Sequence, residues 1–149
     1  MSDASRVIRD QLLVCLASVA GVEYNELKYL EDITQNSFTQ GKDKRFGVRP
    51  GVTPEIGEDG VNKTLTYNQT FEFVLVKGYK QSAHSDSGKY EAFLDLHEIA
   101  LRFYTKAMNG LPSRALNAIN LVIDEPTFEN KDKVAVLTGN IDILYRLTL

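Results

Sequence analysis

From Lys133 to Leu149 the sequence alternates apolar and polar residues, and this pattern restricts the possible folds more than any other. Successive side chains of a β-strand point to opposite faces of a sheet, so the pattern predicts a strand with one buried face. Such a strand would span roughly 55 Å, which is long for one domain. We expect either that Gly139 introduces a bulge or bend, or that part of the strand extends beyond its own domain. The predicted buried face comprises Ala135, Leu137, Ile141, Ile143, Tyr145, Leu147 and Leu149.

A second alternating stretch, from Thr64 to Tyr79, predicts another long, half-buried strand. Before it, KRFGVRPGV predicts a short strand that stops at Pro50, since proline cannot donate a hydrogen bond to a central ladder. These two strands are candidates for a hairpin. INLVIDEP predicts a further strand ahead of the final one. The buried face of the second long strand should comprise Leu65, Tyr67, Phe71, Phe73 and Leu75.

Proline, glycine and acidic residues concentrate between Pro50 and Lys63, which predicts a long exposed loop at about 50–63. Glu55, Glu58 and Asp59 lack the alternating oxygen ligands of a calcium loop, so a solvated acidic turn that contacts a neighbour is favoured over a cation site. Upstream, the run KDKR supplies a candidate basic contact patch for phosphate or an acidic neighbouring subunit. Its members are Lys42, Lys44 and Arg45, and a run this short is more often a solvated face.

Two segments have the periodicity of amphipathic helices. The first covers Ser5 to Ala20 and is closed by Gly21. The second runs from about Gly88 to Met108, and its polar stripe is so narrow that we expect burial against a sheet on one flank and a second chain on the other. The expected fold is therefore α+β: one domain over 1–149, with a mixed, mainly antiparallel sheet of four to five strands packed by two main helices.

The sequence lacks the residue groupings that carry catalysis or metal binding. Two histidines and one cysteine lie far apart, and no glycine-rich phosphate loop is present. His84 lies near Asp86 without a nucleophile beside it, His97 is expected at the edge of the core, and Cys15 is expected to be a buried thiol. We therefore expect no catalytic residue, no metal and no cofactor.

Charge and hydropathy argue against two further classes, nucleic-acid-binding proteins and membrane-spanning proteins. The net charge of -3 gives no general electrostatic footprint for nucleic acid. The longest apolar run, LLVCLASVAGV, is well short of the ~20 residues that cross a bilayer, so we expect a soluble, unexported chain.

The order of predicted elements resembles that of tail terminator and tail completion proteins of long-tailed bacteriophages. The shared layout is a leading amphipathic helix, a strand pair with a long loop, a central helix, and two closing strands that end in NIDILYRL. This resemblance implies a structural virion protein, not an enzyme, which closes as a hexameric ring on the tail tube. The ring ends tube polymerisation and offers a joining face for the head connector.

The same resemblance implies the partners and the location. The partners are further copies of the chain, the tail tube protein and the head–tail connector protein, while genomic DNA passes through the lumen without specific binding and no membrane is involved. The location is the tail or neck of the virion, after synthesis in the host cytoplasm. The candidate subunit interface comprises Leu96, Phe103, Tyr145, Leu147 and Leu149, and Glu55, Glu58 and Asp59 are candidates for the lumen.

Two alternatives stay open at this point. One is another neck or tail component of similar size, such as a head-to-tail adaptor or a tail tube subunit. The other is a small dimeric ligand-binding module or enzyme that uses the face of the sheet as a pocket.

Overall fold

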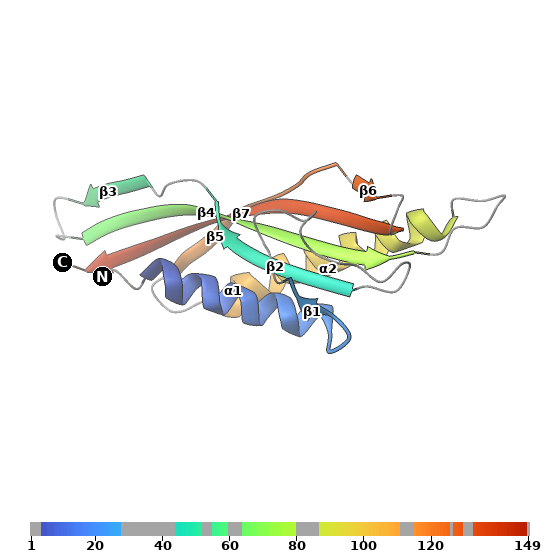
Figure 1. The fold of residues 1–149 in the computed structure, drawn as a ribbon. Helices are drawn as coiled ribbons and strands as arrows, with labels where there is room; N and C mark the ends of the chain where they lie inside the picture. Colours follow the sequence, from blue (N-terminus) through green and yellow to red (C-terminus); the bar gives the residue numbers. More distant parts are fainter. Residues whose placement is uncertain are drawn as a thin grey trace.

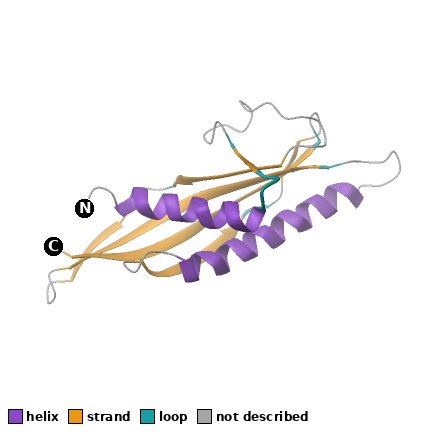
Figure 2. Ribbon diagram, turned by 90° about the horizontal axis from the view of Figure 1, so that it is seen from below, coloured by secondary structure: helices purple, strands orange, loops and turns teal. Residues whose placement is uncertain are grey.

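The computed structural model is one sheet with two helices on one of its faces (Figures 1 and 2). It describes residues 4–27, 44–51, 55–59, 64–79, 87–110, 115–125, 127–129 and 133–148. The sheet is mixed and mainly antiparallel, which confirms the predicted α+β class. The elements in chain order are α1 (Ala4–Ala20), β1 (Asn25–Glu26), β2 (Lys44–Pro50), β3 (Glu55–Asp59), β4 (Thr64–Gly78), α2 (Ser87–Gly110), β5 (Ala115–Ile123), β6 (Thr127–Glu129) and β7 (Val134–Thr148).

The two long strands predicted from the alternation are β4 and β7, and they form the centre of the sheet. Each has 15 residues, and they pair antiparallel over their whole length, from Thr64 opposite Thr148 to Gly78 opposite Val134. The register runs through Gly139 without a shift, so the bulge expected as one possibility at this residue is wrong. Instead, β3 and the adjoining ends of β4 and β7 extend past the N-terminal end of α1 (Figures 1 and 2).

A close approach of neighbouring atoms explains the glycine at position 139. A Cβ atom there would lie 2.4 Å from the carbonyl oxygen of Val122 and 2.6 Å from Cζ of Phe73. The Phe73 ring also contacts Phe103 of α2, edge-on and with 5.4 Å between the ring centroids. Gly139 therefore leaves room for an aromatic ring between the sheet and α2.

Both sides of the central pair carry an interrupted strand. β2 pairs with Phe71–Lys77 of β4 and β3 pairs with Thr64–Asn68, while the Gly51 amide between them donates to the Thr70 oxygen at 2.7 Å. On the other side, β5 and β6 both pair with β7. The sheet consequently has seven strands in five positions, in the order β1-β2-β4-β7-β5, with β3 and β6 beside β4 and β7. The loop predicted at about 50–63 is wrong for 55–59, which form β3; residues 52–54 and 60–63 lie outside the described residues.

The main core lies between the helices and the face of the sheet that they cover. Phe71, Phe73 and Leu75 of β4 are fully buried there, as the alternation predicted. Near the C-terminal end of β4 the face of the sheet that the helices do not cover is buried as well. A smaller cluster lies there, formed by Leu27, Val74, Val76, Val134 and Val136. The other large side chains of the main core are Leu12 and Leu16 of α1, Leu96 and Phe103 of α2, and Leu137, Ile141 and Ile143 of β7.

Both helices match their predicted segments within two residues. α1 ends at Ala20, and Gly21 follows with φ of 99°, a conformation that glycine adopts at little cost. The Gly21 amide donates to the Ala17 oxygen at 3.0 Å, which satisfies one carbonyl of the last turn.

Candidate assembly surface

The inner face of α2 belongs to the core of its own chain. The side chains of Leu96 and Phe103 have 0% exposed surface. A fully buried side chain cannot contact a second chain while its own chain stays folded. The prediction that these two residues form a subunit contact is therefore wrong, because helical periodicity located the apolar arc of α2 without showing which part of it meets the sheet.

The solvent side of α2 carries a second row of mostly apolar side chains, here called the outer stripe. Four of its members keep large exposed fractions: 58% for Tyr90, 56% for Leu94, 50% for Leu101 and 46% for Met108. Consecutive members are separated alternately by four and three residues, which is the spacing of a seam between two paired helices. The outer stripe comprises Tyr90, Leu94, His97, Leu101, Tyr104 and Met108.

Two members of the outer stripe contact aromatic rings of their own chain, one in β6 and one in α2. Tyr90 packs edge-on against Phe128 of β6, with 6.3 Å between the ring centroids. His97 is half-buried and its ring lies 5.9 Å from that of Phe93, so the expected core-edge histidine is confirmed. The sequence signal that points to the outer stripe is the spacing of four and three residues between its members.

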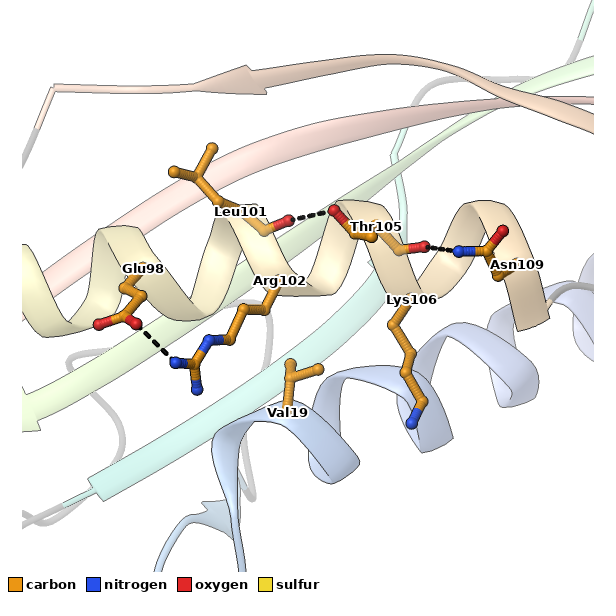
Figure 3. Close-up of a pocket in the computed structure, with 7 residues that line it drawn as sticks. All are labelled: Val19, Glu98, Leu101, Arg102, Thr105, Lys106 and Asn109. Carbon is orange, nitrogen blue, oxygen red and sulfur yellow. Dashed lines mark hydrogen bonds and ion pairs between the residues drawn. The ribbon is translucent and has the colours of Figure 1, made fainter.

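A groove of about 600 Å³ lies beside the outer stripe, between the end of α1 and the second half of α2 (Figure 3). The Arg102 guanidinium donates to Glu98 Oε1 at 2.6 Å, and both side chains are more than half exposed, so this ion pair adds little stability. Thr105 Oγ1 donates to the Leu101 oxygen at 3.3 Å. The residues that line the groove are Val19, Glu98, Leu101, Arg102, Thr105, Lys106 and Asn109.

The lining of the groove contains no cysteine, serine or histidine, and the groups in it that can act as acids, bases or nucleophiles in proteins are those of Glu98, Thr105 and Lys106. Cys15 is buried in the core as predicted; burial raises the pKa of its thiol, and the charge of Lys106 lowers it by less. Among the described residues, no group of three or more His, Cys, Asp or Glu side chains is placed to hold a metal ion.

The helix-free face of the sheet is polar along its middle, and its charged groups bond to one another. Arg49 Nε donates to Glu72 Oε2 at 2.6 Å, Thr70 Oγ1 donates to Asp142 at 2.5 Å, and Thr138 Oγ1 donates to Asp124 at 2.9 Å. A hollow of about 230 Å³ lies among Arg49, Glu72, Asp124, Thr138 and their neighbours. These donors and acceptors are thus paired within the chain.

The predicted basic patch is not assembled. Lys44 and Arg45 are adjacent in β2, so their side chains leave opposite faces of the sheet, and Lys42 lies outside the described residues. Lys44 Nζ instead donates to Glu23 Oε2 at 2.5 Å and lies 5.9 Å from the centroid of the Tyr24 ring. That bond lowers the pKa of Glu23, whereas burial, helped by the charges of Asp95 and Glu23, raises the pKa of Tyr24 to about 12.

The other predicted site residues lie at or near the projecting end of the sheet. Glu55, Glu58 and Asp59 belong to β3 and stand opposite Asn68, Leu65 and Thr64 of β4. Tyr145 and Leu147 of β7 stand opposite Tyr67 and Leu65. Leu149, His84 and Asp86 lie outside the described residues.

No family model and no curated protein matches this chain. In the described part of the chain, neither helix is long and apolar enough to cross a membrane.

Proposed function

We propose that this chain is a structural subunit of a phage tail, a tail terminator that caps the tail tube as a hexameric ring. The observation that supports this most is the pair of unlike sheet edges on either side of β4 and β7. Within the described residues, β5 has a strand on one side only, and on the opposite side of the sheet β1 covers only Arg45 and Phe46 of β2. Natural proteins rarely leave such strand edges uncovered, because an open edge pairs with other chains.

Two unlike edges suit a head-to-tail contact. In such a contact one surface of each subunit meets a different surface of the next, and the assembly closes into a ring when the rotation per subunit allows it. In the proposed ring the β5 edge of one copy meets the β2 and β3 side of the next. The number of six subunits comes from the resemblance to tail terminators.

The projecting end of the sheet is the part that we assign to neighbouring proteins. It lies beyond the helices and contains β3, the first residues of β4 and the last described residues of β7 (Figure 1). Tyr145 and Leu147 are assigned to contacts with neighbouring subunits, the tail tube protein or the head–tail connector. The carboxylates of Glu55, Glu58 and Asp59 are assigned to the lumen, where negative charge repels the DNA backbone and lets the genome pass without being held.

The experiment that tests this function measures ring formation on tail tubes. We expect the purified protein, mixed with polymerised tail tube protein, to bind tube ends and stop elongation, and electron cryomicroscopy should show six copies with β3 at the lumen. The mass of the free protein from light scattering shows whether the ring forms before it meets the tube. Continued elongation with undecorated tube ends, at protein concentrations above that of the ends, would contradict the proposal.

A further inference from the structure

The backbone of β5 alternates between groups that bond to β7 and groups that point away from the sheet. The Asp124 amide donates to the Thr138 oxygen at 2.9 Å, so the backbone groups of Asp124 face β7. Successive residues of a strand direct their N–H and C=O groups to opposite sides, so those of Val122 also face β7, while those of Leu121 and Ile123 face outward. No described strand lies on that outer side. β5 therefore offers two N–H donors and two C=O acceptors to another strand.

On the opposite side of the sheet, β2 is closed to such pairing over most of its length. The Gly51 amide donates to the Thr70 oxygen of β4 at 2.7 Å. By the same alternation the backbone groups of Phe46, Val48 and Pro50 face outward. The Phe46 oxygen already accepts a hydrogen bond from the residue that follows β1, and Pro50 has no N–H group. Only Val48 keeps both a donor and an acceptor, which is too little for a strand pair.

β3 continues this side of the sheet and has an open edge. Gly57 stands opposite Thr66 of β4, and Thr66 bonds toward the same side as Thr70 because an even number of positions separates them. The backbone groups of Gly57 therefore face β4, and those of Ile56 and Glu58 face outward. No described strand covers them. β3 thus offers two donors and two acceptors, the same number as β5.

We propose that neighbouring copies associate by pairing β5 of one copy with β3 of the next in an antiparallel ladder. Within one copy β5 and β3 run in opposite directions, so two copies that keep their helices on the same side of the sheet meet antiparallel. This inference rests on the head-to-tail contact of the proposed function and deepens it, because it names the two strands that meet and excludes β2.

A single antiparallel register uses all the outward groups of both strands, with four hydrogen bonds between the copies. Its two outer pairs exchange these bonds, and its middle pair does not. At the middle pair a valine side chain that is 44% exposed meets a glycine, so the closest approach of the two strands is free of a second side chain. The register pairs Leu121 with Glu58, Val122 with Gly57, and Ile123 with Ile56.

The same register is compatible with closure of a ring. Val122 is level with Glu72 of β4, through Asn140 of β7, whereas Gly57 is level with Thr66. Successive copies are therefore offset by six residues, or ~20 Å, along the strands. Each copy contributes four strand positions at ~4.8 Å, so the strands tilt by roughly 45° from the ring axis. Closed sheets have tilts of about 35–45°.

The first test is disulfide cross-linking between copies. Under oxidising conditions a chain with Val122→Cys should cross-link to a chain with Gly57→Cys, since directly opposite residues bring their Cα atoms within reach of a disulfide. The matched control mixes Val122→Cys with Arg49→Cys, which lies in β2 on the same face of the sheet as Gly57. We expect no product from the control and none from either variant alone, because the remaining thiol, Cys15, is buried.

Three results of this test would overturn the proposal. Cross-linking of Val122→Cys to itself would show a two-fold pair of β5 edges. A product with Arg49→Cys would show pairing at β2. The absence of a product between Val122→Cys and Gly57→Cys, both in the free chain at the highest accessible concentration and on tube ends, would show that these strands do not meet.

The second test removes one backbone donor from the edge of β3. Glu58→Pro deletes an outward N–H group and breaks no bond to β4, whereas Glu58→Ala removes the same carboxylate and keeps the N–H group. We expect the proline variant to raise the dissociation constant for association, measured by sedimentation equilibrium, at least about tenfold above that of the alanine variant. Circular dichroism should show both variants folded. Equal dissociation constants would contradict a ladder at β3.

These outcomes are separable from those for the proposed function. Rings that cap tail tubes without the cross-link between positions 57 and 122 would remove the strand pairing and leave the proposed function. That cross-link in a chain that does not bind tube ends would support the strand pairing and remove the proposed function.

Discussion

At the scale of single residues, Gly139 has less room for an added methyl group than Gly21 or Gly51. Gly139→Ala would bring a methyl group into the Val122 carbonyl oxygen, which belongs to the backbone, and into the buried Phe73 ring, which already contacts Phe103. Overpacking of this kind typically costs ~1–3 kcal/mol. We expect the free energy of unfolding to fall by about 2–3 kcal/mol, measured by urea denaturation followed by circular dichroism.

A double-mutant cycle isolates the contribution of the ring. Phe73→Leu shortens the side chain that faces position 139, so Gly139→Ala should cost less in that background than in the wild type. Equal costs in both backgrounds would show that the carbonyl oxygen of Val122, and not the ring, requires glycine.

At the scale of elements, the two faces of α2 should respond differently to the same substitution. Leu96→Ala removes a fully buried side chain and should lower the free energy of unfolding by ~2–5 kcal/mol. Leu94→Ala, two residues away on the outer stripe, should cost less than about 1 kcal/mol. Both are measured by urea denaturation at a protein concentration where the chain is monomeric, since association adds apparent stability. Similar losses for the two variants would contradict the assignment of faces.

Some of these elements can be predicted from the sequence and others cannot. The long strands and both helices were predictable because their buried side chains repeat with the period of their own element. β3 was not, since EIGED reads as an exposed turn, and only its backbone pairing with β4 makes it a strand. Likewise, the wide apolar arc of α2 predicted two contact surfaces but not that Leu96 faces the sheet and Leu94 faces solvent, because that choice depends on how α2 is docked.

At the scale of the whole molecule, stability should be graded from the centre of the sheet to its edges. β4 and β7 are each flanked by strands on both sides and carry the most buried residues, while β1 pairs over only two residues. Native-state hydrogen exchange should therefore be slowest for amides near Phe73 and Leu137 and fastest in β1 and β6. Greater protection in β1 or β6 than in the middle of β4 and β7 would contradict this gradient.

The pairing of β4 with β7 also determines when the chain is able to fold during synthesis. All of α2, β5 and β6 lies between Gly78 and Val134, the closest residues in the sequence that this pairing joins. β4 therefore leaves the ribosome long before β7 exists. Of the elements that finally surround Phe71, Phe73 and Leu75, only those that precede β4 in the chain, α1 and β2, are then available. Contacts between such distant segments form slowly. The nascent chain has to keep an apolar strand in solution until β7 emerges, which makes this interval the one in which a chaperone has the most to protect.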